Sequence, residues 1–94
     1  MKYVMLGLLD AAWAGKHADR VKPAEAKLKQ LGIKLESIHY TQGQFDFVDV
    51  VDAPDPEAML SFSVWYGAQG FGRIHSLPAF EPRAFDAAVR KAGR

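Results

Sequence analysis

The sequence predicts an α+β fold whose elements follow the order β-α-β-β-α-β, with one further helix toward the C-terminus. Three observations predict it. Apolar residues switch between alternating and helical spacing along the chain. Glycine and proline stand where the spacing changes. The 94 residues are enough for one domain of ordinary size. We therefore treat residues 1–94 as a single domain.

The chain opens with a predicted strand and a predicted helix. Lys2–Leu9 is rich in Val, Leu, Met and Tyr and too short for a helix, so it favours a strand. After a connection over Asp10–Lys16, apolar residues recur at helical spacing until Gly32, a typical helix stop. Because Pro23 falls inside this stretch, the regular helix should begin near Pro23 or have a first turn capped by Asp19. The recurring residues are His17, Val21, Ala24, Leu28 and Leu31.

The middle of the chain predicts a hairpin. Ile33–Thr41 is expected to be a strand, residues 42–44 a tight turn around Gly43, and Phe45–Val51 the returning strand. Alternation in the first of these strands places Ile33, Leu35, Ser37 and His39 on one side and Lys34, Glu36, Ile38 and Tyr40 on the other.

The remaining elements are a helix, a strand and a tail helix. Asp55 is a typical N-cap and Pro56 suits the first helical position. Phe71–Phe80 alternates as a last strand, and Glu81 and Pro82 open the tail helix. The apolar stripe of the helix that starts at Pro56 is Met59, Phe62, Trp65 and Tyr66, and the expected inner face of the tail helix is Phe85, Ala88 and Val89.

This element order is that of the ferredoxin-like fold, in which two helices cover one face of an antiparallel four-stranded sheet. The other face should be polar if it meets water. Here, however, the first and third predicted strands are apolar on both sides. The resulting open apolar face, on the order of several hundred Å², is larger than monomers usually expose. We expect a homodimer or higher oligomer that packs through this sheet face.

Composition excludes several classes of function. The chain has 12 Lys plus Arg and 11 Asp plus Glu, so its charge gives no general attraction to nucleic acid or anionic membrane. The absence of cysteine removes disulfides, thiolate metal sites and cysteine nucleophiles. The longest apolar run, Tyr3–Leu9, is too short to span a bilayer. The run resembles the apolar part of a signal peptide, but Asp10 interrupts it before a cleavage site could follow. We expect a cytoplasmic protein that binds neither nucleic acid nor membrane.

Three motifs, in order, resemble those of the GYD domain family. They are Gly43-x-Phe45-Asp46 before Phe47-Val48, then Asp52-Ala53-Pro54-Asp55, and then Ser76-Leu77-x-Ala79-Phe80. The resemblance covers nearly the whole chain and implies the dimeric α/β-barrel superfamily. That superfamily includes cofactor-free monooxygenases, small-molecule isomerases, haem-degrading enzymes and ligand-sensing modules. Phe45 stands where the family typically has tyrosine, so no role of that hydroxyl carries over.

Candidate catalytic residues come from two strands and the hairpin. His75 and His39 are candidate proton carriers, although the fold would put their strands at opposite edges of the sheet, so they would approach only across a dimer. Asp46 is a candidate base or orienting group. An aspartate after a glycine turn also commonly accepts backbone N–H bonds that fix a hairpin, and we favour this structural role for Asp46.

Aromatic and basic residues are the candidate ligand-binding groups. Trp13 follows the first strand and is expected at the mouth of a pocket, while Arg73 shares a strand face with His75 and would orient a carboxylate or enolate oxygen. An edge-strand arginine reaching solvent is the simpler interpretation of Arg73. The other candidates are Tyr40, Phe45 and Trp65, of which Trp65 also fits a plain core position.

No metal or cofactor is predicted. The three histidines lack ligand spacing such as H-x-x-x-H, and no haem ligand can be named. Most of the acids are explained by a solvated strand end and by helix capping. Asp46 and Asp49 also lie where an RNA-recognition sheet would meet phosphate, which argues against RNA. The acids in question are Asp46, Asp49, Asp52, Asp55 and Glu57.

Two functional hypotheses remain at this level. The first is a homo-oligomer with a pocket between sheet and helices that binds a small apolar or aromatic molecule, and that acts on it by proton transfer without a cofactor. The second is a non-catalytic ligand-sensing or assembly module.

Overall fold

The computed structural model describes residues 1–93, and the strands in this range form one antiparallel sheet. Their order is β2-β3-β1-β4, so β1 lies in the centre and pairs with β3 on one side and β4 on the other. The strands are β1 (Lys2–Leu9), β2 (Lys34–Tyr40), β3 (Phe47–Asp52) and β4 (Gly72–Pro78).

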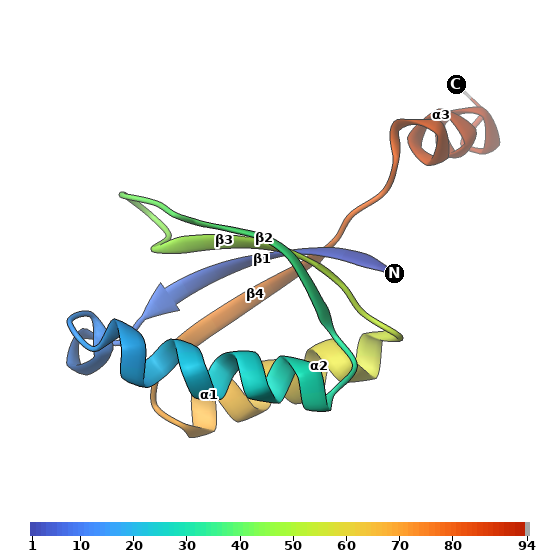
Figure 1. The fold of residues 1–94 in the computed structure, drawn as a ribbon. Coiled ribbons are helices and arrows are strands. Elements are labelled where there is room, and N and C mark those ends of the chain that lie inside the picture. The colour runs from blue at the N-terminus through green and yellow to red at the C-terminus, as the bar shows by residue number, and fades with distance from the viewer. Residues whose placement is uncertain (94) are drawn as a thin grey trace.

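Two helices, α1 (His17–Gln30) and α2 (Pro56–Ala68), lie side by side on one face of this sheet (Figure 1). A short 3₁₀ turn, Ala11–Trp13, joins β1 to α1, and a third helix, α3 (Pro82–Lys91), follows β4. The predicted α+β, ferredoxin-like β-α-β-β-α-β order with a C-terminal helix is confirmed, as is the antiparallel four-stranded sheet.

The two covering helices begin in different ways. Asp55 caps α2 as predicted, because its side chain accepts the backbone N–H of Ala58 at 2.8 Å while Pro56 occupies the first helical position. The two expected starts of α1 are both wrong. That helix begins at His17, and its N-cap residue makes no side-chain capping bond. Pro23 lies inside α1, where the helix gives up one hydrogen bond near its start.

The hydrophobic core fills the space between the sheet and the two helices. One close approach depends on glycine: a side chain at Gly7 would collide with the ring of Phe47, so only glycine lets that ring lie across β1. The buried apolar residues are Tyr3, Met5, Ala24, Leu28, Ile33, Phe47, Val51, Ala53, Ala58, Met59, Phe62, Tyr66 and Phe71.

The predicted alternation along the second strand is wrong over half its length. The pairing of β2 with β3 shifts between Leu35 and Ser37, which indicates a bulge at Glu36. Beyond the bulge, Ile38 lies opposite Asp49 and Tyr40 opposite Phe47. These β2 residues therefore share the helix-covered face with Leu35. A one-residue shift moves every later side chain to the other face.

None of the helices in residues 1–93 covers the opposite face of the sheet (Figure 1). We call it the open face and define it by its apolar residues, Val4, Leu6, Leu8, Val48, Val50 and Leu77. The sequence also predicts an inner face on the tail helix, and within the single chain this is wrong. No residue of α3, all of which is described, is buried. Figure 1 shows that α3 stands away from the sheet.

Candidate functional site

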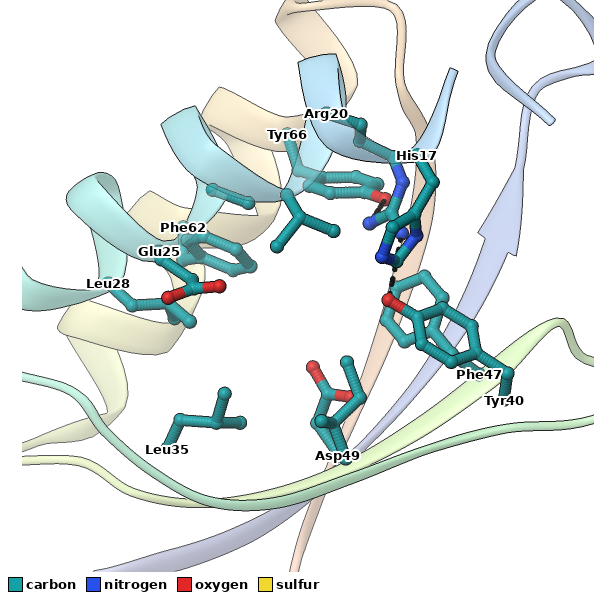
Figure 2. A pocket seen from close by; sticks show the side chains of 13 residues that line it. His17, Arg20, Glu25, Leu28, Leu35, Tyr40, Phe47, Asp49, Phe62 and Tyr66 are labelled. Carbon is teal, nitrogen blue, oxygen red and sulfur yellow. Dashed lines mark hydrogen bonds between the residues drawn. The ribbon is translucent and has the colours of Figure 1, made fainter. Parts of the chain in front are cut away.

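A cavity of about 240 Å³ lies between α1 and the covered face of the sheet (Figure 2). For scale, an engineered apolar cavity of roughly 150 Å³ accepts benzene, so this one has room for a single substituted ring. Its walls come from α1, β2, β3 and α2, and most of them are apolar. The lining residues are His17, Arg20, Val21, Ala24, Glu25, Leu28, Leu35, Ile38, Tyr40, Phe47, Asp49, Phe62 and Tyr66.

Arg20 is the buried cation of this cavity. It lies one helical turn before Ala24 on the sheet-facing side of α1, and only 3% of its surface is exposed. Its Nη1 donates to the hydroxyl of Tyr66 and its Nη2 to the hydroxyl of Tyr40, each at 3.2 Å. Its guanidinium carbon lies 5.3 Å from the ring centre of Phe47. Among the described residues, Arg20 Nε has no hydrogen-bond partner.

Asp49 is the buried acid of the cavity, and its carboxyl group faces the space (Figure 2). It is 5% exposed because it alternates with Phe47 and Val51, which also point into the covered side. Burial raises the pKa of Asp49 to about 7, and the charge of Arg20 opposes only part of that shift. Within the described chain, the Oδ1 atom of Asp49 has no hydrogen-bond partner. A buried carboxyl group near its midpoint at neutral pH is suited to give or take a proton.

Two tyrosines, a histidine and Glu25 supply the other polar groups of the cavity. Burial raises the pKa of Tyr66, so its phenol stays protonated while it accepts the bond from Arg20. Tyr40 lies at the outer rim, and its ring contacts that of His17 at 5.2 Å between centroids. The cavity thus combines apolar walls with a fixed cation, a protonatable acid and hydroxyl groups.

His39 and His75 do not line this cavity. Both lie on the open face, in one row across the sheet that runs from His39 through Val48 and Leu6 to His75. They belong to the edge strands β2 and β4. Three strand spacings separate them, which is about 14 Å. One subunit therefore does not bring the two imidazoles together.

Asp46 is also outside the cavity. Its Oδ2 accepts the backbone N–H of Leu9 at 2.7 Å, and its own N–H donates to the carbonyl of Gly7 at 2.8 Å. Its carbonyl in turn accepts the N–H of Thr41 at 2.8 Å. These bonds tie the hairpin between β2 and β3 to the central strand β1.

The predicted ligand-binding residues are spread over the molecule. Tyr40 is the one that lines the cavity. Trp13 packs edge-on against Phe71, and Trp65 contacts the same ring, so both join the core. Phe45 lies against His75, with ring centroids 5.5 Å apart. Arg73 pairs with Leu8 at the exposed edge of the sheet and takes no part in the cavity.

Sequence reasoning missed Arg20, Asp49, His17 and Tyr66 as a group. Asp49 was detectable, because it alternates along its strand with the apolar residues Phe47 and Val51, which are buried. The expectation that Asp49 is solvated is wrong. Arg20 was detectable as a cation four residues before Ala24 on the buried stripe of α1. The two tyrosine hydroxyls were not detectable, because only the folded chain brings α2 and β2 to the same guanidinium.

Residues 1–93 contain neither a cluster of metal ligands nor a membrane-spanning helix. In that range no group of three or more histidine, aspartate and glutamate side chains is placed to hold a metal ion. No helix in that part of the chain is long and apolar enough to cross a bilayer.

Comparison with known proteins identifies the family and supports the fold. A structure of 5-chloro-2-hydroxyhydroquinone dehydrochlorinase from Burkholderia phenoliruptrix, in complex with 2,5-dihydroxybenzoquinone, superposes with a TM-score of 0.62. It is 12% identical to this chain, and the match covers 89% of this chain and 98% of that one. No curated protein matches the sequence. The model of the GYD domain family matches residues 3–89, and the chain therefore belongs to the GYD domain family.

Proposed function

We propose that this protein binds a small planar ring bearing an ionisable oxygen in the cavity between α1 and the sheet, and moves a proton on it with its own side chains. The observation that carries the proposal is the pair Arg20 and Asp49. Both are almost fully buried, both line one apolar cavity, and each has a polar atom without a partner among the described residues. Unpaired buried polar atoms are costly, and a polar ligand would satisfy them.

The chemistry of the lining suggests the kind of ligand. The aromatic and aliphatic walls favour a flat apolar ring of the size that about 240 Å³ admits. The guanidinium of Arg20 would pair with an oxyanion on that ring. A protein of the same fold was determined with a hydroxylated quinone, 2,5-dihydroxybenzoquinone, and this supports an oxygenated ring.

The proposed step is a transfer of one proton within the ligand. The carboxylate of Asp49 takes a proton from a ring carbon or hydroxyl, and the electron pair moves onto a ring oxygen, where Arg20 balances the new charge. Asp49 then returns the proton to a different atom of the ring. Atoms and electrons balance, because the product is a tautomer of the substrate.

The proposal includes assembly and location. The open face is apolar along β1 and β3 and at Leu77 of β4, and a second copy packed on it would remove this surface from water. We therefore propose a homodimer or a larger assembly that contains this dimer. We also propose that the protein works in the cytoplasm, as its lack of cysteine favours.

The test uses 2,5-dihydroxybenzoquinone as the probe. Calorimetry measures binding, and exchange of the ring C–H protons in D₂O, followed by ¹H NMR, measures proton transfer. Asp49→Asn should still bind but lose the acceleration of exchange. Arg20→Met should weaken binding about 10- to 100-fold, as expected for a lost charge-assisted hydrogen bond.

The matched control is His75→Ala, which changes a titratable residue outside the cavity and should leave both readouts unchanged. If His75→Ala abolished exchange while Asp49→Asn did not, the cavity would not be the reaction site. Binding without any accelerated exchange would instead support the ligand-sensing alternative.

A further inference from the structure

We propose that the C-terminal segment 79–91 is an arm that packs on the open face of a second copy of the chain, while the arm of that copy packs on the first. This exchange rests on the homodimer proposed above and adds a specific element to it. Two unpartnered apolar surfaces occur on one molecule, the side of the arm and the open face of the sheet. In a two-fold dimer each can cover the other.

The arm carries large exposed apolar side chains. Phe80 is 71% exposed and Phe85 68% exposed, which is unusual for phenylalanine in a single folded chain. Val89 follows Phe85 by four residues, so the two share one side of α3. Arg83 and Arg90, which are seven residues or about two turns apart, share the other side of the helix. The helix is therefore amphipathic, with its apolar side free to bind a partner surface.

The arm and the open face lie on the same side of the sheet. Figure 1 shows α3 beyond the end of β4, on the side of the sheet opposite α1 and α2. A second copy that approaches the open face thus meets the arm as it arrives. A copy that approached from the helix-covered side would not meet the arm.

The link between sheet and helix explains why the arm does not cover its own sheet. The N–H of Ala79 still bonds to the carbonyl of Lys2 at 2.9 Å, so the chain stays paired with β1 up to that residue. Glu81 then has extended geometry, with ψ at 154°, as expected directly before Pro82. A short link that is paired at one end and stiff at the other sends the helix away from its own sheet.

The area of contact also favours exchange. A sheet of four strands with about 4.8 Å spacing and strands about 20 Å long gives a flat footprint of roughly 400 Å². Stable interfaces bury about 800 Å² per partner. A ten-residue helix adds a footprint of about 150 Å². Each copy gives one arm and receives one, so the footprint rises to roughly 700 Å² and approaches the usual size.

The experiment is NMR on a mixed dimer, in which ¹³C-labelled and unlabelled full-length chains are combined in equal amounts. Filtered spectra then record only contacts between different copies. The proposal expects contacts between the rings of Phe80 and Phe85 in one copy and the valine and leucine methyl groups of the open face in the other. Contacts within one copy alone would show that the arm folds back, and this would overturn the exchange.

The same sample separates this proposal from the proposed homodimer. A dimer whose arms make no contact between copies contradicts the exchange and leaves the sheet-to-sheet dimer intact. A monomer at NMR concentration contradicts both. A third outcome is that the arm binds vesicles with anionic lipids and that Phe85→Ser removes this binding without weakening the dimer. The apolar side of the arm would then bind a membrane, and the exchange would be wrong.

Paired variants give the size of the effect by sedimentation equilibrium. Phe85→Ser removes an apolar contact from both ends of the dimer and should raise its Kd about 100-fold or more. Arg90→Ser, on the opposite side of the same helix, should change the Kd by less than about 5-fold. Equal Kd values for Phe85→Ser and the unmodified chain would overturn the proposal.

Discussion

The two faces of the sheet depart from the usual arrangement in opposite directions. Under α1 and α2, where apolar residues are expected, the structure buries the charged residues Arg20 and Asp49. On the open face, where polar residues are expected, it presents aliphatic side chains. Buried polarity and exposed apolar surface are both informative because each costs stability in an isolated chain. We infer that the first serves a ligand and the second serves a partner copy.

The largest expected effect concerns Asp49 and pH. Because its pKa in the folded state is raised from 3.8 to about 7, the folded protein keeps a proton that the unfolded chain releases. The contribution of Asp49 to stability is therefore complete below about pH 4 and is lost as pH rises toward 7. The loss amounts to about 4 kcal/mol at most.

Urea unfolding of the unmodified chain and Asp49→Asn between pH 4 and 8, at one protein concentration, measures this difference. The side-chain amide of the variant does not titrate, so the gap between the two free energies of unfolding should change with pH. Parallel curves would mean that Asp49 titrates normally and that the covered face is less dry than the structure indicates.

The next effect compares two neighbours in β1 that point to opposite faces. Met5 is fully buried under the helices, and Met5→Ala should cost about 3 kcal/mol of unfolding free energy at any protein concentration. Leu6 lies on the open face, and Leu6→Ala should cost about 1 kcal/mol in dilute protein. The cost at Leu6 should grow with concentration as the dimer forms, whereas a constant cost would argue against burial of this face by a partner.

A smaller effect separates structure from chemistry at Asp46. Asp46→Ala leaves the N–H of Leu9 without its acceptor and should cost about 1.5 kcal/mol of stability. Its affinity for 2,5-dihydroxybenzoquinone should not change, since Asp46 lies outside the cavity. Thermal unfolding and calorimetry measure the two quantities. Retained stability with lost binding would return Asp46 to the candidate catalytic residues.

The smallest effect is expected at Tyr40, which is half exposed at the rim of the cavity. Tyr40→Phe removes one acceptor from Arg20, but water can replace it there, so the loss of stability should be about 0.5 kcal/mol. Ligand affinity should fall by roughly two- to fivefold, because Arg20 is held less firmly. A loss as large as that of Arg20→Met would indicate that the hydroxyl of Tyr40 contacts the ligand itself.

The fold was predictable because it depends on local signals. Spacing of apolar residues located the helices and strands, and Asp55 with Pro56 marked the start of α2 correctly. The bulge at Glu36 was not predictable, since it depends on pairing with β3 and no glycine or proline marks its position in the sequence. It mattered, because it turns Tyr40 toward the cavity.

The site was much less predictable than the fold. Histidines drew attention by residue type, yet His39 and His75 lie on the open face. The cavity depends instead on Arg20, whose partners Tyr40 and Tyr66 come from distant parts of the chain. These contacts form only through tertiary packing, so the local spacing of residues in the sequence does not predict them. The alternation that places Asp49 inward was readable, but charge alone suggested solvent.

The most direct test of the central claim is a ¹⁵N NMR titration of the full chain with 2,5-dihydroxybenzoquinone. If the covered face holds the ligand site, amide shifts should concentrate around Arg20 in α1, Tyr40 in β2 and Asp49 in β3. The amides of His75 and Leu77 on β4 should stay in place. Shifts confined to β4 and the open face would contradict the account, since the ligand would then bind where we place the partner copy.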